Sequence, residues 1–310
     1  MRSLALHLGL IAVLFALGFL LPAYHHGNIA RIMVLATYAI GYNIMFGYTG
    51  LLSLGHAMFF AAGMYGMGLT SQYLDFTPIP ALVTGIGAGA ALSLIVGLLA
   101  LRTAGVAFMI VTLMFSQAAY LTILLAGTWT RGDEGLVLQR AQRQLWGIDL
   151  SDAGHRYFAA LLLFGICLMI SLRIVSRPSG RVLIAIRENE ERARLLGYDT
   201  YLHKLYAVVA SGTISAAAGA SYGLLFGYVG ATFASVQYSI LPLLWVLLGG
   251  AGTIVGPFIG ALLMFYLIDL SSGITSAYML IAGVALVLLT LFAPQGIAGE
   301  LRRRIWGWLP

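Results

Sequence analysis

The sequence contains little charge and almost no lysine or cysteine. Of its 310 residues, 9% are charged and 60% are hydrophobic, whereas about a quarter of the residues in an average soluble domain are charged. The only cysteine, Cys167, lies inside an apolar run, which excludes a disulfide framework and a thiol metal site and indicates a packing residue. These deficits exclude an ordinary soluble protein and indicate an integral membrane protein.

Motifs of ATP-binding, metal-binding and proton-pumping proteins are also absent. There is no G-x-x-x-x-G-K-[ST] sequence, and there is no H-E-x-x-H or paired Cys/His spacing. Charge within the hydrocarbon region is almost nil, apart from Asp269 at the end of one segment and Arg102 in a tight connection, whereas ion-coupled pumps use carboxylates or histidines inside the membrane. Because no nucleophile, base and metal ligands converge, we expect no catalytic, cofactor or metal site, and an energy source outside this chain.

Long apolar runs dominate what the sequence does contain. The mean hydropathy is +0.93, and a membrane-spanning helix needs about 20 apolar residues. Residues 4–22 could be a cleaved signal peptide, but the run is long and no A-x-A-like site follows it, which favours a membrane helix. The expected segments are 4–22, 32–46, 56–74, 81–101, 104–127, 158–175, 205–227, 238–249, 254–270 and 276–292.

Basic residues between the runs predict the orientation of the chain, because they are retained on the cytoplasmic side of a membrane. They gather between residues 173 and 204 and again in the tail after residue 299, so both regions are expected in the cytoplasm. The connection at 128–157 balances basic with acidic residues and is expected outside. The cytoplasmic basic residues are Arg173, Arg177, Arg181, Arg187, Arg192, Arg194, Lys204, Arg302, Arg303 and Arg304.

Two cytoplasmic ends require an even number of crossings between Lys204 and Glu300. Residues 238–270 are therefore not one long helix, and the glycines and Pro257 place a break at 248–257. Segments of 12 to 15 residues are also too short to cross a core about 30 Å thick as straight helices. The expected fold class is an all-α integral membrane protein with about ten membrane segments, some broken or re-entrant, and with N- and C-termini in the cytoplasm.

Another break is expected at residues 47–60, which read GYTGLLSLGHAMFF. In chain order, 47–60 is called the first break and 248–257 the second. Irregular backbone at membrane depth is tolerated only inside protein or beside a water-filled cavity. Breaks in opposite halves of a transporter are typical of its translocation pathway. Glycines four residues apart additionally predict close helix packing, and they occur at Gly219, Gly223 and Gly227 and at Gly252, Gly256 and Gly260.

The cytoplasmic connection at 180–204 has an amphipathic helical pattern. Ile184, Leu195 and Leu196 alternate with arginines and glutamates, and Gly197 provides a helix stop. One interpretation is a solvated loop that only orients the chain. A contact surface for another protein explains better why four acidic residues and a helical repeat are present.

Several stretches resemble the LivH/LivM family of membrane permeases, most closely the LivM-type subunit. The coupling stretch AIRENEERARLLGYDTYLHKLYAVVASGTISAAAGASYG at 185–223 and the Gly-rich GYTGLLSLGHAMFFAAGMY at 47–65 resemble family signatures. TRGDEGL at 130–136, LLGGAGTIVGPFIGA at 247–261 and LFAPQGIAG at 291–299 match further motifs in the family order. The resemblance covers most of the chain and implies one transmembrane permease domain over 1–310, with a cytoplasmic coupling segment at 176–204 and an external loop at 128–157.

The resemblance implies a permease subunit of an ATP-binding-cassette importer for branched-chain or other hydrophobic or aromatic amino acids in the bacterial inner membrane. It further implies a homologous LivH-type permease, two ATPase subunits that bind ATP and Mg, and a periplasmic solute-binding protein as partners. No nucleic acid is expected. The chain itself is then not an enzyme. The residues implied in ATPase coupling are Arg187, Glu188, Glu191, Ala193, Arg194 and Gly197; Arg192 stands where the family motif has a small residue.

Two further sets of candidate residues follow from the breaks and the external motif. The candidate pathway residues are Thr49, Ser53, His56, Phe59, Gly249, Gly250 and Gly252. They could contact solute, or they could satisfy backbone groups freed at the breaks. Arg131, Asp133 and Glu134 could bind the solute-binding protein or form a solvated turn. Importers of urea, short amides or aromatic carboxylates, and a channel that needs no ATPase, remain alternatives.

Overall fold

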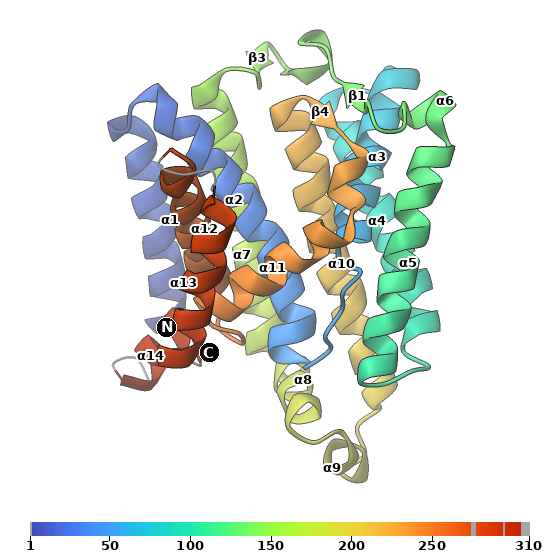
Figure 1. Ribbon diagram of the computed structural model, residues 1–310, viewed down its shortest axis with the longest axis vertical. Helices are drawn as coiled ribbons and strands as arrows, with labels where there is room; N and C mark the ends of the chain where they lie inside the picture. Colours follow the sequence, from blue (N-terminus) through green and yellow to red (C-terminus); the bar gives the residue numbers. More distant parts are fainter. Residues whose placement is uncertain (1, 274–276, 294, 305–310) are drawn as a thin grey trace.

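Helices form most of the described chain (Figure 1). The computed structural model describes residues 2–273, 277–293 and 295–304; residue 276, Pro294 of the closing motif and the tail beyond residue 304 lie outside this range. The longer helices are α1 (Arg2–Leu20), α2 (Ala23–Asn43), α3 (Ala57–Tyr73), α4 (Pro78–Ala100), α5 (Val106–Leu125), α7 (Ala153–Ser176), α8 (Pro178–Glu188), α10 (Thr200–Phe226), α11 (Val236–Gly249), α12 (Gly256–Ser272) and α13 (Tyr278–Phe292).

Short elements connect these helices. They are the π-helix η1 (Ile44–Tyr48), the helices α6 (Gly127–Thr130), α9 (Glu190–Leu195) and α14 (Gly296–Arg304), the 3-10 turns η2 (Ala141–Arg143) and η3 (Ala231–Ala234), and the strands β1 (Leu136–Val137), β2 (Gln144–Leu145), β3 (Ile148–Asp149) and β4 (Tyr228–Val229). Strand β1 pairs antiparallel with β4, with Leu136 opposite Val229. Strand β2 pairs with β3 in a second hairpin.

Five helices of the described chain are long and apolar enough to cross a membrane: residues 24–48, α4, α5, α7 and α10. Shorter apolar helices of 10 to 17 residues occupy 4–20, α11 and α12. A backbone that makes its hydrogen bonds within each helix is the solution that a bilayer permits. The chain is therefore an all-α multi-pass membrane protein.

Helices α2 and α10 form the centre of the molecule, whereas α4 and α5 expose most of their apolar residues. Helix α10 contacts α2, α3 and α4, and small residues let it approach them. A Cβ added at Gly219 would lie 1.9 Å from the Phe60 carbonyl oxygen, and one at Gly212 would lie 2.3 Å from Ser93 Cβ. The packing role expected for Gly219 is confirmed.

The two ends of the molecule differ (Figure 1). At one end lie α6 and the strands β1, β3 and β4; at the other end α8 and α9 project beyond the remaining helices. At the end with the strands, Arg143 connects η2 to α10. Its Nε donates to the Leu224 carbonyl at 2.8 Å, and its Nη2 donates to the Leu225 carbonyl. A guanidinium on the last carbonyls of α10 satisfies orphan acceptors and complements the helix dipole.

Several expected boundaries are wrong by a few residues. The segment expected at 32–46 begins at Ala23, after Pro22, so the first turn of α2 contains His25 and His26. The external loop expected at 128–157 ends earlier, because the Asp152 side chain accepts from the Gly154 and His155 amides and begins α7. The first turns of α2 and α7 contain polar residues, so in the sequence the starts of both helices resemble loops.

Both expected helix breaks are present. After η1 the chain is irregular until α3 begins at Ala57, and the helix expected to end near 249 ends there, with α12 beginning at Gly256. Gly250 and Gly252 adopt φ values of +120° and +76°, which L side chains rarely accept. The residues at 248–257 therefore separate α11 from α12.

Candidate functional site

The irregular stretch after η1 is buried, and nearby side chains satisfy its backbone. The Thr49 hydroxyl donates to the Ile44 carbonyl at 3.0 Å, and the Ser53 hydroxyl oxygen accepts from the Gly55 amide at 3.2 Å. Tyr42 donates to the Ser53 carbonyl at 3.0 Å. Unpaired backbone groups are costly in a medium without water, so these contacts allow an open backbone at this depth.

His56 lies in a closed polar and aromatic environment. Its Nε2 is 2.7 Å from Ser215 Oγ, and its ring stacks on Tyr38 with centroids 5.6 Å apart. The Ser215 hydroxyl donates to the Ser211 carbonyl at 2.9 Å. The single hydroxyl proton of Ser215 is used in that bond. His56 Nε2 therefore carries a hydrogen and donates it to Ser215 Oγ. His56 joins the start of α3 to the middle of α10.

Phe59 is also fully buried, in a cluster with Met45, Met58, Val96 and Phe108. Its ring meets His56 edge to face at 5.3 Å. The structure therefore brings His56 and Phe59 together. Thr49 and Ser53 are likewise buried, and each bonds within the break itself.

A prediction follows for the contact between His56 and α10. The variant Ser215→Ala leaves the buried His56 Nε2–H with only the longer contact of 3.4 Å to Ser211 Oγ, and the loss of its main partner costs about 1–3 kcal/mol of stability. We expect a lower Tm for the detergent-purified variant. The control is Ser221→Ala, a buried serine of the same helix. Equal Tm values for the two variants would show that the histidine contact does not stabilise the fold.

The second break contacts the first through Asn43. Asn43 Nδ2 donates to the Thr253 carbonyl at 2.8 Å, and Asn43 Oδ1 accepts from the Gly252 amide at 3.0 Å. A Cβ added at Gly47 would lie 2.6 Å from the Gly252 nitrogen. The glycines of both breaks thus permit direct contact between their backbones.

Close approach also explains the other glycines of the second break. A Cβ at Gly249 would lie 1.8 Å from the Gly256 carbonyl oxygen, and one at Gly250 would lie 2.8 Å from the Gly299 nitrogen. Gly252 therefore contacts Gly47, whereas Gly249 packs against Gly256 and Gly250 packs against Gly299. Asn43 was not among the residues singled out from the sequence; a buried amide in an apolar helix is the signal that could have identified it.

Arg187 links this junction to the predicted coupling segment. It stands near the end of α8, and its Nη1 donates to the Gly47 carbonyl. A Cβ added at Gly252 would lie 3.0 Å from the same Nη1. The guanidinium therefore lies against both helix breaks.

The other predicted coupling residues lie on α8 and α9. Ala193 is buried against Val182 and Ile186, so the two helices form one unit. Glu188 and Glu191 are exposed, Arg194 pairs with Glu190 at 3.6 Å, and Gly197 ends the segment at φ +88°. Leu195 and Leu196 at the tip are 88% and 71% exposed.

Glu190 anchors α9 to α10. Burial opposes its ionisation, but the hydrogen bond and charge of Lys204 outweigh burial and hold the pKa of Glu190 below its ordinary value. Lys204 Nζ donates to this carboxylate, and the Asn189 side chain accepts from the Arg192 amide at 2.9 Å to begin α9. These contacts therefore fix the position of α9 relative to α10.

The external motif forms a tight turn after α6. Arg131 adopts φ +57°, and Gly132 and Gly135 are also in the left-handed region. Residues other than glycine rarely adopt this backbone conformation, so Arg131 occupies a strained position in the turn. Arg131, Asp133 and Glu134 are all exposed, at the end of the molecule opposite α9.

Comparisons with known proteins match most of the length of the chain. The family described as branched-chain amino acid transport system, permease component, matches residues 27–292. The high-affinity branched-chain amino acid transport system permease protein LivM of Escherichia coli (strain K12) is 28% identical over 299 residues, covering 88% of this chain and 69% of the relative.

Two more distant relatives match about half of the chain. A probable branched-chain amino acid transport permease protein LivM of Methanocaldococcus jannaschii is 32% identical and covers 46% of each chain. The autoinducer 2 import system permease protein LsrC of Photorhabdus laumondii is 29% identical, covering 49% of this chain and 44% of the relative. None of the solved structures matches the chain. The match over most of its length shows that this protein belongs to the family of permease components of branched-chain amino acid transport systems.

Proposed function

We propose that this chain forms half of the translocation pathway of an ATP-binding-cassette importer in a bacterial inner membrane. Its solutes are branched-chain or other hydrophobic or aromatic amino acids, received from a periplasmic binding protein. The name of the Escherichia coli relative supports this solute class. A LivH-type permease forms the other half, and two separate ATPase subunits bind ATP and Mg.

The proposed orientation puts α8, α9 and both termini in the cytoplasm, with ten membrane segments. The arginines near α8 and α14 support it through the positive-inside rule. The turn with Arg131, Asp133 and Glu134 then faces the periplasm and receives the binding protein. Its exposed charges are available for that contact.

The observation that carries the proposal is the apolar tip of a projecting segment. Leu195 and Leu196 are exposed at α9, which projects beyond the other helices, and exposed apolar side chains grouped together are typical of protein contact sites. Neighbouring Tyr198 is 44% exposed. We assign this tip, with the exposed Glu188, Glu191, Arg194 and Gly197, to the ATPase contact. The predicted coupling residue Ala193 is buried and supports the tip from inside.

The contacts within the chain supply a route from the ATPase to the pathway. Closure of the ATPases moves α9, and α8 moves with it because Ala193 holds the two together. Arg187 then displaces Gly47 and the neighbouring Gly252, where the two helix breaks meet. Rigid elements that move against a discontinuous helix are an established means of switching a transporter. The pathway residues Thr49, Ser53 and His56 lie within this first break, and Phe59 lies in the first turn of α3 that follows its irregular stretch.

A charge at the tip tests this assignment. We expect Leu195→Glu to weaken the association of the ATPases with affinity-tagged permease about tenfold or more, as for a central apolar contact. The fold should be retained, since Leu195 is 88% exposed. ATPase recovery is measured after co-purification, and ATP-dependent leucine uptake is measured in proteoliposomes.

The control is Trp146→Glu, which introduces the same charge at a side chain that is 87% exposed at the opposite end. It should retain the ATPases. Wild-type recovery of ATPases by Leu195→Glu would contradict the tip assignment. Leucine uptake by the chain without any ATPase would overturn the importer in favour of a channel, and uptake of urea or short amides instead of leucine would overturn the solute class.

A further inference from the structure

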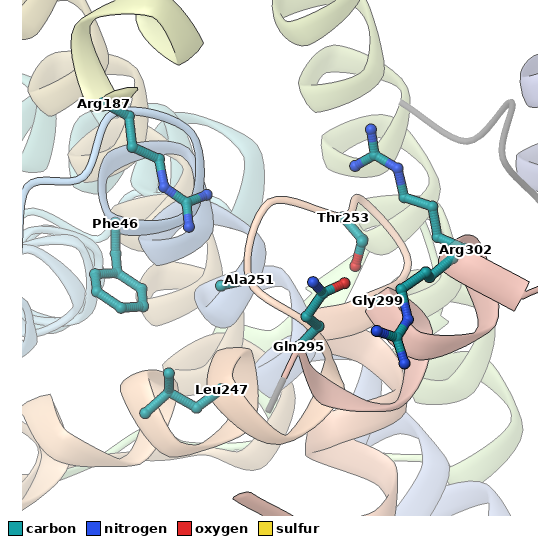
Figure 2. A pocket seen from close by; sticks show the side chains of 9 residues that line it. Phe46, Arg187, Leu247, Ala251, Thr253, Gln295, Gly299 and Arg302 are labelled. Carbon is teal, nitrogen blue, oxygen red and sulfur yellow. The ribbon is translucent and has the colours of Figure 1, made fainter. Parts of the chain in front are cut away.

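A basic cavity of about 570 Å³ lies between α8, the second helix break and α14 (Figure 2). Arg187 reaches it from α8, and Gln295 and Arg302 reach it from the opposite side. Phe46 and Leu247 form an apolar wall. This volume falls within the range of roughly 300–1,000 Å³ that is usual for ligand pockets.

The charged side chains around the cavity are predominantly basic. Arg187, Arg302 and Arg303 line it, and no carboxylate is among its described lining residues. Arg303 is neutralised by Glu300, since its Nη2 lies 2.7 Å from Glu300 Oε1. Arg187 bonds only to the uncharged Gly47 carbonyl. Two guanidinium charges therefore have no counter-ion among the described residues.

An adjoining cavity of about 490 Å³ shares Arg187, Ala251 and Arg302 with the first. Arg181 adds a further positive charge to it, and Glu188 is its one carboxylate among the described lining residues. Tyr48 also lines it, and the Tyr48 hydroxyl is buried with no hydrogen-bond partner. Unsatisfied buried donors indicate a missing partner.

We propose that the two cavities bind an anionic phospholipid, with its phosphate between Arg187 and Arg302. Guanidinium groups match phosphate oxygens in charge and geometry. The apolar wall of Phe46 and Leu247 fits the start of an acyl chain, which a free phosphate lacks. Basic pockets between membrane helices on the cytoplasmic side are suited to acidic headgroups; only this choice of leaflet rests on the proposed orientation.

Native mass spectrometry of the purified full-length chain, and of its complex with the ATPases, tests the proposal. The probes are dioctanoyl phosphatidylglycerol, dioctanoyl phosphatidylcholine and inorganic phosphate. We expect one phosphatidylglycerol to be retained, and Arg302→Gln to weaken its binding about fivefold. Arg302 is exposed, so its replacement should leave the fold intact, and Arg302→Lys, which keeps the charge, should retain most of the affinity. Arg192→Gln, an exposed arginine of α9, is the charge-matched control.

Each alternative outcome overturns the proposal. Equal retention of phosphatidylcholine would show that the phosphate charge is not selected. Equal binding of inorganic phosphate would replace the lipid by a free anion. Loss of phosphatidylglycerol in the complex would show that a protein partner occupies the site. These results do not depend on transport, so they remain distinct from failure of the proposed function.

Discussion

Arg187→Gln is expected to reduce leucine uptake about tenfold or more, since a hydrogen bond from a charged donor contributes roughly 1.5–3 kcal/mol. The variant removes the charged contact from α8 to the Gly47 carbonyl, beside Gly252. The ATPases should still bind, because the tip of α9 is unchanged. ATP hydrolysis should therefore continue while uptake falls, which is measured as the number of leucine molecules imported per ATP in proteoliposomes.

Arg173→Gln is the matched control, because Arg173 is an exposed arginine near the end of α7. It should leave the leucine-to-ATP ratio unchanged. A wild-type leucine-to-ATP ratio for Arg187→Gln would show that the movement of α8 reaches the helix breaks through another contact. Loss of ATPase binding by this variant would instead make Arg187 part of the docking surface.

Gly219→Leu is expected to prevent stable folding. The added side chain would begin 1.9 Å from the Phe60 carbonyl oxygen, and neither α10 nor α3 can move away without losing its other contacts. Overpacking of a core by flexible side chains costs about 1–3 kcal/mol, and a collision with backbone costs more. The measurement is the yield of monodisperse protein after size-exclusion chromatography in detergent.

Gly87→Leu provides the comparison at a lipid-facing site. A Cβ at Gly87 meets no atom within 4 Å, so leucine there should be accommodated and should improve helix propensity. Its yield and Tm should equal or exceed those of the wild type. Normal folding of Gly219→Leu would refute the close crossing of α3 and α10.

The positions of the apolar helices could be predicted because hydropathy records burial and lipid contact along the sequence. The residues at which helices begin were harder to predict. The Asp152 side chain caps the start of α7, and Pro22 precedes a first turn of α2 that contains two histidines. Polar residues at these positions are equally typical of a loop. The breaks were predictable, since glycine and proline restrict where a helix can continue.

The contacts between the breaks could not be predicted from local pattern. Asn43 and Gly252 are 209 positions apart, and Arg187 and Gly47 are 140 apart. Spacing along one element carries no information on which distant element will face it. The resemblance implied a coupling role for Arg187, but its contact with the Gly47 carbonyl could not be predicted from the sequence.

Lys204 is the only lysine in the sequence, and its amine is held by Glu190 with 14% of its side chain exposed. Apart from the amino terminus, an amine-acylating reagent thus has one target on this protein. That target lies where α9 meets α10. The rate at which it is acylated therefore reports how often α9 separates from α10, and it does so in the native sequence, without any introduced probe.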